Sequence, residues 1–436
     1  MFAGLRKRSG SKQEIGLSLY IVIKVASISR FLVALVLFVG VNAAVAASPL
    51  GRTVVQPISL EDFKLTETVK AEGKPSSWWL ARAFRESEER PDVVVCGSSQ
   101  IGGLQASDAN ITGKPVDFVS NHHCPTIEQA LVLKSYVFLS ALPGAMISDH
   151  FAIAKALYED RSAPPIVVLT ISPRDFLDNS LPCAGATGPY KYFSKFSDMT
   201  AYTGLAYNQP WSRLEHFTGS EMPMRKLEPY INYLTNKTVN DLVPAAEIVG
   251  TAGGAKNTKV ADASAQIQAQ LKFVMGGYEG NIRPGQAVLT PNLPQIYVDN
   301  TRDYKRRYKN THPPVYDVQM QYLKECLSYL DKKGTKVLIV GMPLTQSNRE
   351  LLNTDFWNRY RADILVSTAP TGAKFLDLIE DATFNQKDFC DTVHLNASGG
   401  KKLAEKMAAF ILQDKAYYQA LRSGKSGIAA GSTSWQ

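Results

Sequence analysis

The chain of 436 residues lacks several features that mark large classes of protein. It has no internal repeat and no nucleic-acid-binding motif, and its basic residues are thinly spread although the net charge is +8. We therefore expect no nucleic acid among its partners. Charged residues make up 20% and hydrophobic residues 45%, which excludes a disordered or fibrous chain and favours an ordinary globular fold.

Cysteine is also scarce, and the count of five leaves at least one thiol unpaired within the chain. Cys96 lies in an apolar predicted strand and Cys326 on the apolar face of a predicted helix, so we expect both to be buried thiols. The sequence leaves open whether a disulfide joins two of the other three, which are Cys124, Cys183 and Cys390.

No spacing typical of a metal site is present. His122 and His123 are adjacent, but neighbouring side chains of a strand point in opposite directions, and no carboxylate or cysteine pattern completes a ligand set. We therefore expect neither a metal nor another cofactor.

One uncharged run, "FLVALVLFVGVNAAVAA" (Phe31–Ala47), is apolar enough to cross a bilayer, at the short end of the useful range. Six basic residues and one acid precede it, so the positive-inside rule places the first thirty residues in the cytoplasm. We expect residues 1–47 to form a cytoplasmic tail and a membrane anchor, with the remainder on the periplasmic or cell-surface side. The alternative is a signal peptide cleaved near "AVAAS".

Apolar runs that read as buried strands alternate with helical patterns along most of the chain. The alternation predicts an α/β fold, a three-layer doubly wound parallel sheet with helices on both faces. The predicted strands are 91–97, 115–121, 164–171, 335–344 and 373–378, and the predicted helices are 126–142, 316–334, 348–366 and 397–412.

The pattern fails between about residues 184 and 310, where glycine-rich, proline-rich and aromatic stretches follow one another. We interpret this range as a large insertion. The remaining boundaries are then a connecting segment at 48–90, a core in two parts at 91–183 and 311–417, and a disordered tail at 418–436.

Two predicted strands end in polar residues, and parallel sheets bind ligands at such ends. In "CGSSQ", a glycine turn precedes Ser99, which is either a nucleophile or a helix N-cap. In "SPRDFLDN", Arg174 either stabilises an oxyanion or forms a surface ion pair with Asp175 or Asp178.

A third polar stretch, "DFCDTVHLNASGG" (388–400), places Asp391 three residues before His394. In a turn, this spacing allows the carboxylate to hold the imidazole Nδ1–H while Nε2 faces a serine from another strand. A histidine alone would more often be structural, so the interpretation depends on the serine.

Together, and in this order, "GSSQ", "SPRDF" and "DTVHLN" resemble the SGNH (GDSL-like) hydrolase superfamily. They are most similar to its membrane-anchored group, which includes the D-alanyl transfer protein of teichoic acids and the alginate O-acetylation proteins. The resemblance covers about 91–179 and 316–412. It implies that Ser99 is the nucleophile, His394 the base and Asp391 the acid that orients the base.

The sequence departs from the family pattern at the oxyanion site. Arg174 stands where the family has an asparagine in "GxND", and "SNHHCPT" has no evident block-two glycine. We expect the oxyanion to be bound by the backbone N–H of Ser99 or Gln100, together with Arg174 and Asn121.

The resemblance implies a serine esterase or O-acyltransferase that forms an acyl-serine and acts on a cell-surface or exported glycan, beside a membrane-bound O-acyltransferase. A non-catalytic protein that binds a glycan or a partner is the alternative, favoured by the unusual Arg174. A lipase-like enzyme or thioesterase that acts on lipids is a third possibility.

Overall fold

The structure is a computed structural model that describes residues 32–33, 36–44, 47, 74–159, 161, 163–216, 284–285, 287–293, 296–309 and 313–430. The chain divides into two units, residues 1–56 with 215–242 and residues 57–214 with 243–436. The sheet, the helices that cover it and the candidate site all belong to the second unit.

The predicted membrane anchor requires a correction. Of Phe31–Ala47, the structure describes 32–33, 36–44 and 47, all helical. Within the described ranges, no helix has both the length and the apolar character needed to span a membrane. This finding overturns the anchor, and with it the localisation that we derived from the anchor; residues 1–30 lie outside the described part.

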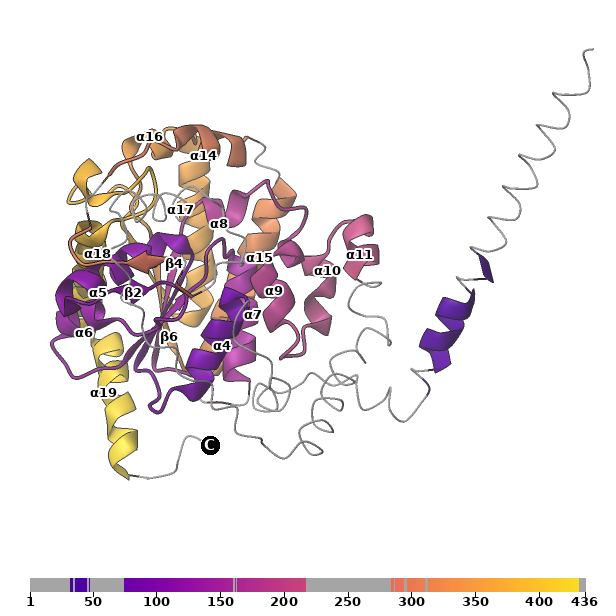
Figure 1. The fold of residues 1–436 in the computed structure, drawn as a ribbon, viewed down its shortest axis with the longest axis horizontal. Helices are drawn as coiled ribbons and strands as arrows, with labels where there is room; N and C mark the ends of the chain where they lie inside the picture. Colours follow the sequence, from indigo (N-terminus) through magenta and orange to yellow (C-terminus); the bar gives the residue numbers. More distant parts are fainter. Residues whose placement is uncertain are drawn as a thin grey trace, which may run out of the picture. The chain divides into compact units, whose positions relative to one another are not determined.

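The second unit is an α/β fold built on a five-stranded sheet in the order β3-β1-β4-β6-β7, in which every neighbouring pair is parallel (Figure 1). The predicted parallel sheet is therefore confirmed. Most of these strands are uninterrupted apolar runs because helices bury both of their faces. Their bounds are β1 Val93–Gly97, β3 Val137–Ala141, β4 Ile166–Ile171, β6 Lys336–Gly341 and β7 Lys374–Asp377.

Alternate residues of each strand enter two separate hydrophobic clusters. Val94 and Cys96 of β1 pack with the helices of one face, and Val93 and Val95 pack with those of the other. This alternation is the two-residue period of a strand. The first face carries α4 (Ser76–Glu86), α7 (Ile147–Tyr158), α9 (Gly188–Phe193), α15 (Pro313–Lys332) and α17 (Thr354–Thr368).

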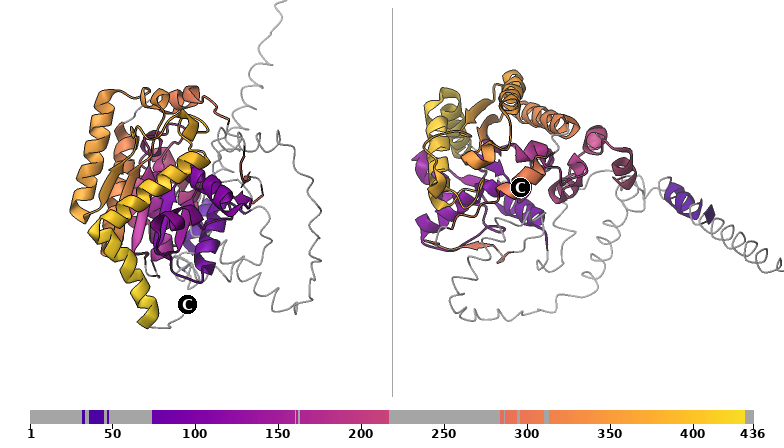
Figure 2. Two further views of the ribbon diagram at one scale, coloured as in Figure 1. Left: turned by 90° about the vertical axis from the view of Figure 1, so that its left-hand side faces the viewer. Right: turned by 90° about the horizontal axis from the view of Figure 1, so that it is seen from above.

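The second face carries α5 (Gly102–Thr112), α6 (Pro125–Leu131), α18 (Ala397–Gln413) and α19 (Lys415–Ala430). Figure 2 shows α18 and α19, in yellow, lying across this face. Helix α19 occupies most of the predicted disordered tail, and Leu421 is buried in the core. Residues 431–436 of that tail lie outside the described part.

The predictions for 115–121 and 126–142 are partly wrong. The first range contains only the short strand β2 (Val116–Asp117), which pairs antiparallel with β5 (Val288–Leu289) outside the main sheet. In the second range, α6 ends at Leu131 and the run "VFLSA" forms β3. A short apolar run does not show by its periodicity whether it is a helix or a strand.

The shorter helices connect these layers. They are η1 (Ser99–Ile101), α8 (Arg174–Leu177), η2 (Ala184–Ala186), η3 (Thr200–Tyr202), α10 (Thr203–Ala206), α11 (Pro210–His216), α14 (Thr301–Arg307), α16 (Gln346–Arg349), η5 (Ala369–Thr371) and η6 (Gln386–Asp388). The described parts of the predicted insertion include α9, whose Tyr190 hydroxyl lies 2.9 Å from that of Tyr322 in α15. Residues 217–283 of it lie outside the described part.

All five cysteines are described and buried, and none of them forms a disulfide. No disulfide therefore joins Cys124, Cys183 and Cys390 in any pairing. Burial raises the pKa of Cys96 and of Cys390 to about 12, so both thiols stay protonated near neutral pH.

Candidate active site

Ser99 lies directly beyond the carboxyl end of β1, at the start of η1. The turn requires Gly97, since a Cβ there would lie 2.2 Å from the Thr170 hydroxyl oxygen on β4. Ser98 occupies the N-cap position of η1, but its side chain makes no capping hydrogen bond. Ser99 is not an N-cap residue, since Ser98 and Ile101 hold those positions in η1 and α5. Its hydroxyl lies 2.8 Å from the imidazole Nε2 of His394.

A contact between two glycines brings the serine and the histidine together. The backbones of α5 and α18 touch where Gly400 meets Gly103: a Cβ on Gly400 would lie 1.9 Å from the Gly103 carbonyl oxygen. Ser99 precedes α5 by three residues, and His394 precedes α18 by three residues. The close crossing of the two helices therefore places both residues at one point on the sheet rim.

The loop that carries His394 is held at both ends. Asn396 caps α18 by accepting hydrogen bonds from the backbone N–H groups of Ser398 and Gly399, and its amide donates to the Lys387 carbonyl at 2.6 Å. Asp388 forms an ion pair with Lys402 at 2.7 Å. These contacts account for the conspicuous run "DFCDTVHLNASGG": its polar residues define the shape of the loop as well as its chemistry.

Asp391 and His394 form the predicted pair. The imidazole Nδ1 lies 2.7 Å from Asp391 Oδ2, and both side chains are buried. A carboxylate only accepts hydrogen bonds, so this contact places the imidazole proton on Nδ1 and leaves Nε2 free to accept from Ser99. Asp391 Oδ1 accepts two more bonds, from the backbone N–H groups of Val393 at 2.8 Å and His394 at 2.7 Å.

A fourth side chain, Asn300, joins the three predicted residues. Its Nδ2 donates to Asp391 Oδ2 at 2.7 Å, and its Oδ1 accepts from the backbone N–H of Thr392 at 3.1 Å and from the Thr392 hydroxyl. Sequence reasoning missed it because it lies within the predicted insertion. An asparagine just before a short helical stretch is typical of an N-cap, which gives no indication of a contact with residue 391.

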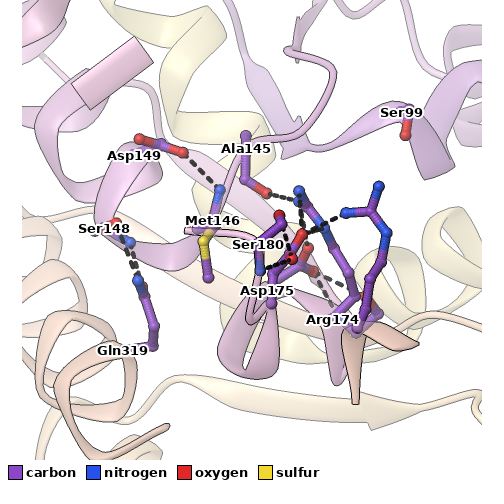
Figure 3. Close-up of polar contacts among 12 residues, drawn as sticks. Ser99, Ala145, Met146, Ser148, Asp149, Arg174, Asp175, Ser180 and Gln319 are labelled. Carbon is purple, nitrogen blue, oxygen red and sulfur yellow. Dashed lines mark hydrogen bonds and ion pairs between the residues drawn. The ribbon is translucent and has the colours of Figure 1, made fainter. Parts of the chain in front are cut away.

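Arg174 has other partners. Its guanidinium donates to Asp178 Oδ2 at 3.0 Å and to the Ala145 carbonyl at 2.8 Å, and it lies 3.6 Å from Asp175. Figure 3 shows these bonds grouped around Arg174, whereas Ser99 stands apart and shares none of them. Burial acts to raise the pKa of Asp178, but Arg174 and Arg307 outweigh it and lower the pKa to about 2.

The same cluster includes the first turn of α7. Asp149 Oδ2 accepts from the backbone N–H of Met146 at 2.7 Å (Figure 3), and its other oxygen accepts from the Thr187 hydroxyl. Burial raises the pKa of Asp149 to about 7, although these hydrogen bonds and Arg174 oppose the shift. The alternative interpretation of Arg174, an ion pair with Asp175 or Asp178, therefore matches its contacts, but the pair is buried rather than exposed.

The other predicted binding residues lie in different surroundings. Gln100 follows Ser99 and is buried. The Asn121 amide donates to the His123 carbonyl at 3.0 Å, within its own loop and not toward Ser99. The structure thus brings together Ser99, Asp391 and His394, with Gln100 beside them, and gives Asn121 and Arg174 other hydrogen-bond partners.

His122 and His123 diverge, as neighbouring residues of an extended segment do. His122 Nδ1 bonds the Leu139 carbonyl of β3 at 2.9 Å, and burial lowers the pKa of His122 to about 4. His123 is exposed and lies 2.8 Å from Glu128. Among the described residues, no three His, Cys, Asp or Glu side chains are grouped as metal ligands would be.

The sequence matches no protein-family model and no curated protein. The chemical interpretation of the site therefore rests on its own geometry, that of a serine, a histidine and an aspartate linked by hydrogen bonds at the carboxyl edge of a parallel sheet.

Proposed function

We propose that this protein is a serine ester hydrolase or O-acyltransferase of the SGNH-like type, acting through an acyl-serine. The observation that carries the proposal is the hydrogen-bonded chain from Ser99 Oγ through His394 to Asp391, with distances of 2.8 and 2.7 Å. A serine hydroxyl is a weak nucleophile until a base accepts its proton, and the base works best when a third group holds its tautomer.

The proposed reaction uses each of these atoms. His394 Nε2 accepts the proton of Ser99 as Oγ attacks the acyl carbonyl, and the resulting imidazolium gives that proton to the departing alkoxide. An acyl-serine remains. His394 then accepts a proton from water or from an acceptor hydroxyl as that oxygen attacks the acyl carbonyl. The bond between the acyl carbon and Ser99 Oγ breaks, and the imidazolium gives the proton to Oγ, which restores the Ser99 hydroxyl. The acceptor alone decides between hydrolysis and transfer.

The oxyanion formed in each step needs donors. Ser99 and Gln100 open η1, and the first N–H groups of a helix have no partner within it. These two N–H groups are therefore our proposed donors. Arg174 contributes no bond at Ser99, so in this proposal it shapes the rim through Asp178 and the Ala145 carbonyl.

The fold and the order of the motifs support the SGNH-like assignment. A parallel sheet with helices on both faces is compatible with the doubly wound, flavodoxin-like core of that superfamily. By the same resemblance, the proposed substrate is an O-acylated glycan, or a glycan that receives an acyl group.

The alternative is a non-catalytic protein that binds a glycan or a partner through the same rim. One observation favours it: the residue at the family's asparagine position, Arg174, is bonded to carboxylates and makes no hydrogen bond to Ser99. A fluorophosphonate, which labels only an activated serine, separates the two functions.

Our test compares the two adjacent serines. We expect a fluorophosphonate to label the protein and the Ser98→Ala variant at similar rates, since Ser98 makes no capping bond, and to leave Ser99→Ala unlabelled. Acetate release from an O-acetylated glycan should show the same ranking. An unlabelled wild-type protein would reject the enzyme and favour the binding protein, whereas labelling of Ser99→Ala would reject Ser99 as the nucleophile.

A further inference from the structure

The geometry points to Asn300 as a positioning residue that holds the carboxylate of Asp391 for His394. This inference rests on the proposed function and extends it beyond Ser99, Asp391 and His394. It starts from an anomaly at the N-terminus of α14. Asn300 occupies the N-cap position, yet its side chain makes no bond to the helix. Both ends of its amide contact the Asp391 loop instead.

Asn300 donates to the same carboxylate oxygen that lies against the histidine. Asp391 Oδ2 accepts from His394 Nδ1 and from Asn300 Nδ2, each at 2.7 Å. With the two backbone donors on Oδ1, the carboxylate accepts four hydrogen bonds and is almost fully buried. Such a carboxylate is fixed in orientation, because rotation would break several of these bonds at once. It can then stabilise the imidazolium without taking its proton.

The backbone places Asn300 in this position. The N–H of Val298 donates to the Cys390 carbonyl at 2.8 Å, which joins the two segments just before the amide contact. Asn300 Oδ1 accepts from both the N–H and the hydroxyl of Thr392, so the amide cannot rotate without losing these bonds. The orientation that presents Nδ2 to Asp391 is therefore the only one that satisfies both ends.

The other titratable groups that interact electrostatically with Asp391 stay neutral near pH 7. Burial raises the pKa of Tyr297, of Tyr304 and of Cys390. Neither a phenol nor a thiol with a raised pKa adds charge on the acid side of a pH profile. A change in that profile in an Asn300 variant can thus be attributed to the Asp391–His394 pair.

The experiment measures the rate of fluorophosphonate labelling of Ser99 from pH 5 to 9. Asn300→Ala removes one hydrogen bond to a charged group, so we expect labelling about ten- to a hundredfold slower. Its acid limb should move to higher pH, because a carboxylate with fewer donors holds the imidazolium more tightly.

A second variant keeps the shape of the Asn300 side chain and replaces its hydrogen-bond donor with an acceptor. Asn300→Asp retains the acceptor for Thr392 but places a second carboxyl against Asp391 Oδ2 at high pH. We expect it to be slower than Asn300→Ala at pH 8 and to recover relative to wild type as the pH falls, when the introduced carboxyl gains a proton and becomes a donor. A purely structural role would not produce this recovery.

The control is Asn353→Ala, since Asn353 caps α17 by accepting from the backbone N–H of Phe356 at 2.9 Å. We expect this variant to lower the Tm and to leave the labelling rate per folded molecule unchanged. Wild-type rates and profiles in both Asn300 variants, with Ser99→Ala unlabelled, would overturn the role of Asn300 alone. Labelling of Ser99→Ala, or none of the wild type, would overturn the proposed function and this inference with it.

Discussion

At the scale of single residues, the site depends on how one carboxylate is satisfied. Asp391 accepts hydrogen bonds from the two backbone N–H groups that follow it closely and from His394 and Asn300. Arg174 illustrates the opposite case, because its charge is balanced by Asp178 and Asp175 and is therefore not available to a substrate. The polar groups of this rim that can act on a substrate are those whose hydrogen bonds and charges are not already taken up by the protein.

We expect Asp391→Asn to slow labelling of Ser99 by about 10⁴-fold, since an amide favours the wrong imidazole tautomer. The Tm should change far less than the activity because the side chain keeps its shape. Asp381→Asn, which breaks an ion pair with Lys406 instead, is the control. A labelling rate of Asp391→Asn within a few-fold of wild type would contradict the role of the carboxylate.

The raised pKa of Asp149 predicts that the free energy of unfolding depends on pH. Its pKa is raised by burial to about 7, whereas an unfolded aspartate titrates near 4. Between these values the folded state binds the extra proton, so this group lowers the free energy of unfolding as pH rises, by up to about 1.4 kcal/mol per unit. Above pH 7 the loss is complete.

The measurement is urea unfolding at several pH values between 4 and 8, for wild type and Asp149→Asn. His122 and His150, whose pKa values burial lowers to about 4, act in the opposite direction, so only the difference between the two proteins isolates Asp149. We expect wild type to lose stability relative to the variant as pH rises through this window. Parallel curves would show that Asp149 is ionised throughout.

At the scale of elements, the crossing of α5 and α18 is the structural basis of the site. Ser99 precedes α5 and His394 precedes α18, and the Gly103–Gly400 contact fixes how closely the N-termini of the two helices approach each other. Two helix axes can approach this closely only where neither carries a side chain. The glycines therefore fix the positions of Ser99 and His394 through backbone packing alone.

We expect Gly400→Ala to lower the stability by roughly 1–3 kcal/mol, as overpacking does, and to slow labelling of Ser99 by moving His394 away. The control is Gly188→Ala, because a Cβ at the start of α9 meets no atom within 4 Å. Unfolding curves and labelling rates test both variants. Unchanged activity and stability in Gly400→Ala would mean that the crossing tolerates a wider separation.

At the scale of the whole second unit, the buried sheet separates two hydrophobic layers and holds every thiol out of reach. Cys96 and Cys326 lie in one layer and Cys124 in the other. None of the five cysteines forms a disulfide. Stability therefore comes from packing on both sheet faces rather than from cross-links.

We expect a thiol reagent such as 5,5′-dithiobis(2-nitrobenzoate) to react slowly with the native protein, since all five thiols are buried, and with five thiols after unfolding in guanidinium without reductant. Fewer than five reactive thiols in the freshly unfolded protein would reveal a disulfide and contradict the structure. The free Cys390, next to Asp391, makes this count informative for the site as well.

Features that depend on neighbouring residues could be predicted from the sequence. Uninterrupted apolar runs indicated β1, β4 and β6, and the three-residue spacing of Asp391 and His394 indicated their pairing, because each depends only on a short stretch of backbone. The role of Ser99 as a nucleophile was implied by the family resemblance and stays a prediction. The boundary of β3 could not be predicted, because its apolar run fits a helix equally well.

Only the tertiary structure decided contacts between residues far apart in the chain. Asn300 lies 91 positions from Asp391, and no local pattern records that its amide serves another loop rather than its own helix. The partners of Arg174 and the burial of Tyr417 and Leu421 in α19 likewise follow from packing. Sequence by itself determined β1, β4, β6 and β7, the turn and the His–Asp spacing, because these are short-range properties of the backbone. The assembled site required the fold, because hydrogen bonds between distant residues form only when the packed core brings them together.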